Sequence, residues 1–117
     1  MKEEVCSEDA LAPGQMRTAM LGRIPIVVVR TPSGELFALS DKCLHQGASL
    51  SEGRLGETMA PADDVGVYIP TRDGEILRCP WHGYEYDVRT GCLLAGDGRR
   101  TRTFRVVVEG GTILVST

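Results

Sequence analysis

The chain has 117 residues, enough for one domain with a modest core, so we expect a single domain over residues 1–117. Charged residues make up 25% of it, and the formal net charge of −3 argues against nucleic acid as a partner, because phosphate binding requires a basic surface. Its longest strongly apolar stretch, residues 24–29, is too short to span a bilayer, and residues 1–10 lack the apolar core of a signal peptide. The sequence therefore predicts a cytoplasmic protein without a membrane anchor.

In chain order, the predicted elements are short strands separated by glycine-containing turns. A short helical turn is compatible with residues 7–12. Strands are predicted at residues 23–31, 35–41, 65–71, 73–79, 84–89, 101–110 and 112–117, with loops at 46–64 and 91–98. No window holds a long apolar period of 3.6 residues. The sequence thus predicts an all-β fold built from hairpins, closing as a small barrel or sandwich.

Two mixed cysteine–histidine pairs are the motifs that indicate chemistry. Cys43 and His45 lie two apart in "CLHQGASL", and Cys79 and His82 lie three apart in "CPWHGYEYD". These pairs use every histidine in the chain, which makes chance an unattractive explanation. Thiolate and imidazole are the ligands that soft and borderline metal ions prefer. Four such ligands on two loops would form a closed metal site.

Three readings of these pairs compete. Cys2His2 is a common zinc set, but zinc modules usually take one cysteine pair and one histidine pair, whereas each loop here supplies one of each. A cysteine–histidine nucleophile is weaker still, because the pairs are duplicated and no orienting Asn or Asp is evident. The mixture suits a dinuclear cluster in which one iron takes both cysteines and the other takes both histidines.

At this point the chain resembles the Rieske [2Fe–2S] proteins, through "CLHQGASL" and "CPWHGYEYDVRTG", over about residues 15 to 115. The resemblance implies one [2Fe–2S] cluster per chain, with Cys43 and Cys79 on the inner iron and His45 and His82 on a solvent-facing outer iron. It also implies an antiparallel β-sandwich or partly closed barrel with two cluster-binding loops at its tip. Glycines follow both histidines, at Gly47 and Gly83, where a bare backbone can turn sharply.

The sequence departs from respiratory members of that family at several positions. Ala48 and Trp81 replace the two cysteines that cross-link the loops there, so no disulfide is expected. Tyr84 replaces a serine whose hydroxyl bonds a bridging sulfide, while Tyr86 retains a tyrosine that bonds a cysteine sulfur. Fewer hydrogen bonds to sulfur imply a potential at the low end of the Rieske range. Residues 57–72 form an added piece that the compact Rieske ferredoxins lack.

The resemblance implies a one-electron carrier, not an enzyme, that passes electrons from a flavoprotein reductase to a terminal oxygenase or similar acceptor. An oxygenase would also need a mononuclear iron held by two histidines and a carboxylate, and both histidines here are already used. The alternatives are a small subunit of a larger oxidoreductase, of oxygenase or nitrite reductase type, and a zinc-binding structural module.

Two other groups of residues are interpreted as ordinary. Cys6 is predicted to lie in a mobile terminus, and Cys92 to pack as a small apolar residue. Four arginines near the C-terminus are interpreted as a solvated face, with a docking patch as the alternative: Arg99, Arg100, Arg102 and Arg105.

Overall fold

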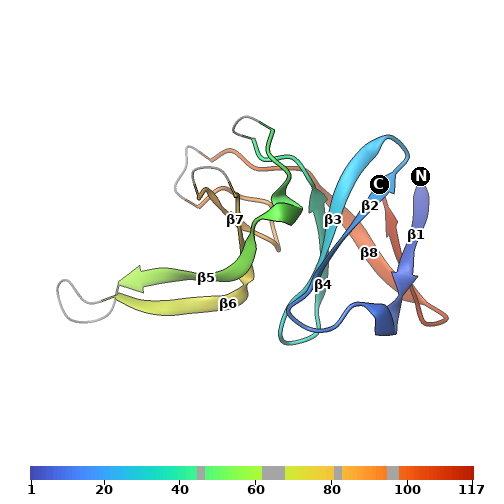
Figure 1. Ribbon diagram of the computed structural model, residues 1–117, viewed down its shortest axis with the longest axis horizontal. Coiled ribbons are helices and arrows are strands. Elements are labelled where there is room, and N and C mark those ends of the chain that lie inside the picture. Colours follow the sequence, from blue (N-terminus) through green and yellow to red (C-terminus); the bar gives the residue numbers. More distant parts are fainter. Residues whose placement is uncertain (45–46, 62–67, 81–82, 95–97) are drawn as a thin grey trace.

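An antiparallel six-stranded sheet forms the larger part of the molecule (Figure 1). The computed structural model describes residues 1–44, 47–61, 68–80, 83–94 and 98–117, with the backbone alone for 57–61 and 68–73. The sheet order is β1 (Lys2–Ser7), β9 (Thr112–Ser116), β8 (Thr103–Glu109), β4 (Leu36–Ser40), β3 (Ile24–Arg30) and β2 (Met16–Leu21). Because the edge strands β1 and β2 also contact each other, the sheet closes nearly into a barrel.

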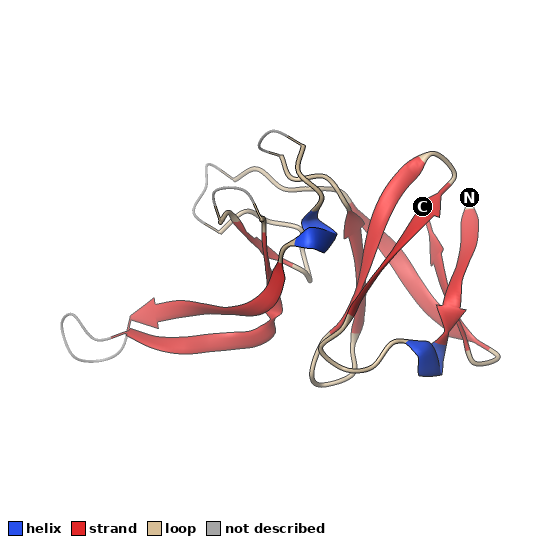
Figure 2. Cartoon of the chain, in the orientation of Figure 1, coloured by secondary structure: helices blue, strands red, loops and turns tan. Residues whose placement is uncertain are grey.

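A second, three-stranded sheet lies beside this barrel, in the order β5 (Arg54–Pro61), β6 (Tyr68–Arg78) and β7 (Glu85–Asp87). Two 3₁₀ helices, η1 (Glu8–Ala10) and η2 (Leu50–Glu52), are the helical elements among the described residues (Figure 2). The predicted all-β fold with partial barrel closure is therefore confirmed.

Strand β3 is buried on both faces and separates two apolar cores. Ile26 and Val28 point into the barrel, where they pack with β8 and β9 side chains. Val27 and Val29 point the opposite way, into a core that also contains Cys43 and Cys79. This explains the continuous apolar run of the strand, since a strand covered on one face would alternate instead. The second sheet and both cysteines thus rest on the outer face of the barrel.

Arg89 links the two sheets by polar contacts. Its Nε donates to Glu75 of β6 at 2.7 Å, and its two terminal nitrogens donate to Glu35, in the turn between β3 and β4. Its guanidinium also lies 5.0 Å from the ring centroid of Phe37. The hydrogen bonds that Arg89 donates to Glu35 hold the pKa of that carboxyl below its ordinary value. The link joins segments more than fifty residues apart and supports the orientation of the small sheet on the barrel.

The structure corrects several predicted boundaries. The predicted loop 46–64 contains β5, and the predicted strands 65–71 and 73–79 belong to one strand, β6, although residues 65–67 lie outside the described part. The ladder of β5 and β6 shifts register between Gly56 and Thr58, where β6 carries the extra residues. The apolar stretches on either side of that shift read as two strands because the pattern breaks there.

Of the added piece at residues 57–72, the described residues 57–61 and 68–72 belong to the outer part of the β5–β6 hairpin, which projects from the body of the molecule (Figure 1). The longest principal extent is 49 Å, against 30 and 20 Å for the other two.

The terminus was also predicted wrongly. Residues 2–7 form β1, which pairs with β9, and Cys6 is half-buried against the barrel core rather than mobile. The pattern of β1 is mostly exposed and polar, so its strand character comes from the partner strand and not from its own composition.

We expect Gly91→Ala to destabilise the fold strongly. Gly91 has a φ of +78°, and a Cβ there would lie 2.4 Å from the carbonyl oxygen of Thr101. Gly34 has a similar φ of +94° with no atom within 4 Å, so Gly34→Ala tests the backbone strain alone. Gly34→Ala should lower the free energy of unfolding by about 1 to 2 kcal/mol, and Gly91→Ala by at least about 2 kcal/mol more. Equal losses in urea unfolding would show that the segment containing Thr101 moves aside freely.

Candidate metal centre

The two loops that carry the cysteine–histidine pairs are closed in the same way. The backbone N–H of Cys43 donates to the carbonyl of Ala48 at 2.7 Å, and that of Cys79 donates to the carbonyl of Tyr84 at 2.8 Å. Each bond spans five residues and begins at the cysteine. The two cysteines therefore sit at equivalent positions of two similarly built loops.

Glycine makes both turns possible. Gly47 and Gly83 each lie four residues after the cysteine, and both have a φ of +68°. This left-handed conformation is one that side-chain-bearing residues rarely adopt. The predicted sharp turns at these two glycines are confirmed.

Both cysteines are buried in one core, outside any disulfide. Cys43 is 3% exposed and Cys79 is 2% exposed, and neither is in a disulfide. Ala48, which is itself buried in this core, has no sulfur with which a disulfide between the loops could form. His45 and His82 lie outside the described residues, so the structure does not place them, and it shows no cluster of three possible ligands within the part it describes. Two buried, unbridged thiols on adjacent loops are the donor set that one iron of a mixed cluster requires.

Tyr86 lies beneath the cysteines and is fully buried. Its hydroxyl oxygen accepts the N–H of Leu44 at 2.9 Å and lies 3.2 Å from Sγ of Cys43. Burial, reinforced by the contact with Cys43 and by the neighbouring thiols, raises the pKa of Tyr86 well above its ordinary value, so the hydroxyl stays protonated. A thiolate bound to iron carries no proton, so in a site that holds the metal the Tyr86 hydroxyl would be the donor to the Cys43 sulfur. The predicted contact between Tyr86 and a cysteine sulfur is confirmed.

Asp41 anchors the first loop, a role that the sequence reading missed. Its carboxylate accepts the backbone N–H of Ser51 at 2.7 Å and the Ser51 hydroxyl at 3.0 Å. Its backbone carbonyl accepts the N–H of Leu50 at 2.9 Å. The carboxylate is largely buried and joins the two ends of the loop. Asp and Ser side chains commonly form hydrogen bonds with nearby backbone groups, so their presence was a possible signal. The pair was not recognised because ten residues separate them.

A third segment, residues 92–94 and 98–100, covers Tyr86 on the side opposite to its partner strand β6. Leu93 forms a β-bridge with Tyr86 and is buried, and its N–H donates to the carbonyl of Arg99 at 3.0 Å. Leu94 donates to the carbonyl of Glu85 at 2.9 Å. The described part of this segment therefore covers the tyrosine, while residues 95–97 lie outside the described part.

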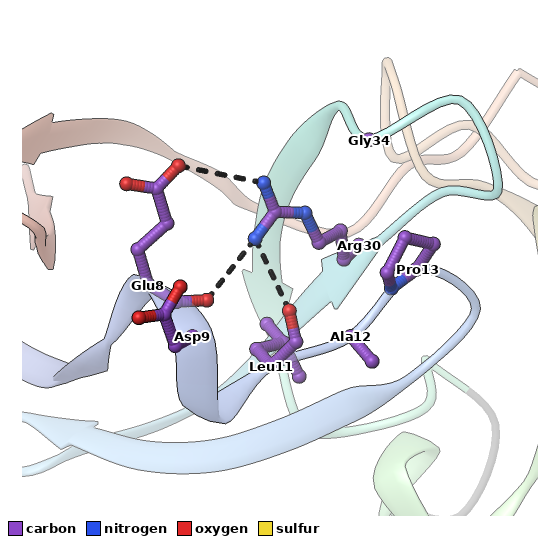
Figure 3. Close-up of a pocket in the computed structure, with 7 residues that line it drawn as sticks. All are labelled: Glu8, Asp9, Leu11, Ala12, Pro13, Arg30 and Gly34. Atoms are coloured by element: carbon purple, nitrogen blue, oxygen red, sulfur yellow. Dashed lines mark hydrogen bonds and ion pairs between the residues drawn. The ribbon is translucent and has the colours of Figure 1, made fainter.

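A shallow pocket of about 350 Å³ lies at the opposite end of β3 and β4, next to η1 (Figure 3). Arg30 crosses it, donating to the carbonyls of Glu8 and Leu11 and pairing with the Glu8 carboxylate at 3.7 Å. These contacts attach η1 to the barrel. The pocket thus serves the packing of the terminus and contains neither of the two cysteines.

The comparison with protein families settles the classification. The Rieske [2Fe–2S] domain matches residues 1–105. The chain belongs to the Rieske family. Its fold, with a small sheet and two loops mounted on a barrel, and its buried thiol pair agree with that membership. A Rieske chain of this kind carries one [2Fe–2S] cluster, in which two cysteines and two histidines ligate different irons.

The relatives of this Rieske chain are ferredoxins of dioxygenase systems. It is 32% identical over 114 residues to the ferredoxin component of the p-cumate 2,3-dioxygenase system of Pseudomonas putida, covering 95% of this chain and 81% of the relative. It is 34% identical over 113 residues to the ferredoxin component of biphenyl 2,3-dioxygenase of Rhodococcus jostii, covering 96% and 89%. A solved complex of reduced oxygenase and oxidised ferredoxin in carbazole 1,9a-dioxygenase contains a chain that matches with a TM-score of 0.75, at 27% identity, covering 98% of this chain and 92% of that one.

None of the helices in the described part of the Rieske chain is long and apolar enough to cross a membrane.

Proposed function

We propose that this Rieske chain is a one-electron carrier that receives electrons from a flavoprotein reductase and passes them to a terminal oxygenase or a similar acceptor. The observation that carries the proposal is the pair of buried thiols, Cys43 and Cys79, on two similarly built loops. The Tyr86 hydroxyl contacts the Cys43 thiol. Support also comes from the relatives, which are ferredoxin components of dioxygenase systems. A solved complex of an oxygenase with a ferredoxin, one chain of which matches this chain in fold, adds to it.

In the proposed site, Cys43 and Cys79 hold the inner iron, and His45 and His82 hold the outer iron. The two thiols lie in the same core, at equivalent points of their loops, which is the arrangement that a shared inner iron requires. The cluster supplies reversible one-electron chemistry. The chain supplies the thiolates, a hydrogen bond from Tyr86 and loops held rigid by Asp41 and by the strands of the small sheet.

The chain itself is proposed to carry out no catalysis. A Rieske oxygenase needs a second, mononuclear iron held by two histidines and a carboxylate, and this chain has only two histidines in total, both assigned to the cluster. We further propose that residues 1–117 act as a single domain in the cytoplasm, where reduced thiols are available for cluster assembly.

Metal analysis tests the proposal directly. Protein purified without oxygen should contain two irons and two acid-labile sulfides per chain, in a one-to-one ratio, because one cluster is held per chain. The reduced protein should give the electron paramagnetic resonance signal of a mixed cysteine–histidine cluster, with its low average g value. One zinc per chain in a colourless protein, or a signal typical of four cysteine ligands, would contradict the proposal.

A further inference from the structure

A run of arginines borders the candidate metal centre. Residues 99–105 contain four arginines and no acidic residue, in a chain whose formal net charge is negative. Three of them, Arg100, Arg102 and Arg105, are exposed and form no ion pair within the described residues. We call these three the basic strip. Like charges side by side on a surface raise the local positive potential, which attracts an anionic partner.

Backbone pairing places the strip next to the cluster loops. Arg100 forms a β-bridge with Cys92, whose neighbour Leu93 pairs with Tyr86. The carbonyl of Arg102 accepts the N–H of Ser40 at 2.9 Å, one residue before Asp41, where the first loop begins. The strip therefore runs from the segment covering Tyr86 past the base of the loop that carries Cys43.

Arg102 is held in place by stacking. Its guanidinium lies 4.8 Å from the ring centroid of Phe104, which is 8% exposed. Such stacking fixes a long side chain and lowers the entropy lost when a partner binds. The neighbouring acidic groups are engaged elsewhere: Glu85 pairs with Arg78 at 2.7 Å, and Asp87 accepts the backbone N–H of Arg89.

Apolar side chains are exposed on the same loops. Leu44, which follows Cys43, is 40% exposed, and Leu94, in the segment covering Tyr86, is 36% exposed. A protein interface commonly combines an apolar centre with a charged rim that orients the partner. The rim here is positive, so it fits a partner whose docking face is rich in carboxylates.

We propose that the basic strip is the docking surface for the electron donor, a flavoprotein reductase with a carboxylate-rich face. This inference rests on the proposed function. With neutral imidazoles, a cluster held by two thiolates is uncharged when oxidised and has one negative charge when reduced. That added charge weakens the attraction to an acidic partner, so the strip binds such a partner more tightly before electron transfer than after it. A donor must bind the oxidised carrier and release the reduced one, whereas an acceptor needs the reverse.

Two flavins that differ only in charge provide a kinetic test. Flavin mononucleotide carries a phosphate dianion that riboflavin lacks, and light generates the neutral one-electron-reduced form of each when a sacrificial amine donor such as EDTA supplies the electron and solvent the proton. The reduced flavin gives one electron to the oxidised protein and releases one proton to solvent. At low ionic strength we expect the flavin mononucleotide to react several-fold faster than riboflavin, with the difference lost in high salt. Equal rates at low ionic strength, or a slower flavin mononucleotide, would overturn the proposal.

Paired charge reversals locate the effect. Arg100→Glu/Arg102→Glu should abolish or invert the preference for flavin mononucleotide. The control Arg17→Glu/Arg23→Glu makes the same change in net charge at two exposed positions outside the strip, one on β2 and one in the β2–β3 turn. It should leave the preference for flavin mononucleotide intact. An equal effect of both pairs would show that net charge alone is sensed. Should the first pair lose its iron, Arg100→Gln/Arg102→Gln replaces it, with the preference again expected to disappear.

Equilibrium binding distinguishes a donor from an acceptor. Fluorescein-labelled hexaglutamate should bind the oxidised protein several-fold more tightly than the reduced protein, as followed by fluorescence anisotropy at low ionic strength. Tighter binding to the reduced protein, or no difference, would overturn the assignment to the donor. Iron and sulfide are measured first, so a protein without a cluster counts against the proposed function and not against the basic strip.

Discussion

Cys79→Ser is expected to yield protein without a cluster, and Cys43→Ser the same. Both thiols are buried, at 2% and 3% exposure, and each begins the hydrogen bond that closes its loop. A serine oxygen is a poor replacement for a thiolate on iron, and a buried hydroxyl left without its metal is unfavourable. Iron and sulfide should fall from two of each per chain to background, together with the visible absorption. Urea unfolding of the colourless variants would report how far the loops depend on the metal.

The other two cysteines provide matched controls. Cys6 lies in β1 against the barrel core, and Cys92 is half-buried in the segment that covers Tyr86. Cys6→Ser and Cys92→Ser change the same atom outside the loops and should keep full iron and sulfide content. A Cys92→Ser protein as colourless as Cys79→Ser would mean that the ligands are assigned wrongly, because Cys92 would then be acting as a ligand.

The site was predictable from sequence where its chemistry is local. Cys43 with Gly47, and Cys79 with Gly83, lie within single loops, so residue types and spacing alone indicated two ligand-bearing turns. Tyr86 was assigned through the resemblance to the Rieske family, and the structure adds that the sulfur it contacts is that of Cys43, on the other loop. The histidines stay a prediction, since they lie outside the described part of the structure.

What the sequence did not reveal depends on contacts between distant segments. The sequence around Asp41 does not indicate that Ser51 closes the loop by donating to its carboxylate. The sequence around Arg89 likewise does not indicate that Glu35 and Glu75 both accept hydrogen bonds from it. Strand β1 was missed for a related reason: its residues are mostly polar, and it is a strand because β9 offers a free edge to pair with. Local pattern cannot supply such information, because the partner determines the conformation.

Tyr86→Phe is expected to lower the reduction potential by tens of millivolts. The hydroxyl accepts from Leu44 at 2.9 Å, so its single proton is available to the sulfur of Cys43, 3.2 Å away. A hydrogen bond to sulfur stabilises the more negative, reduced form, and its loss favours the oxidised one. For a one-electron couple a tenfold change in equilibrium constant is ~59 mV, and one such bond accounts for about that or less. Voltammetry of the cluster-loaded protein at neutral pH measures the shift.

The same substitution should also weaken the fold, because the N–H of Leu44 loses its acceptor. A part-buried donor left unpaired costs about 1 to 3 kcal/mol, which urea unfolding would detect. Tyr84→Phe is the control: Tyr84 packs against the same core, and its hydroxyl is expected to have little influence on the potential. If Tyr84→Phe lowers the potential as far as Tyr86→Phe does, the shift reflects general loss of polarity in the core. If Tyr86→Phe loses stability without any change in potential, the hydroxyl serves the Leu44 backbone and its proton does not reach the sulfur.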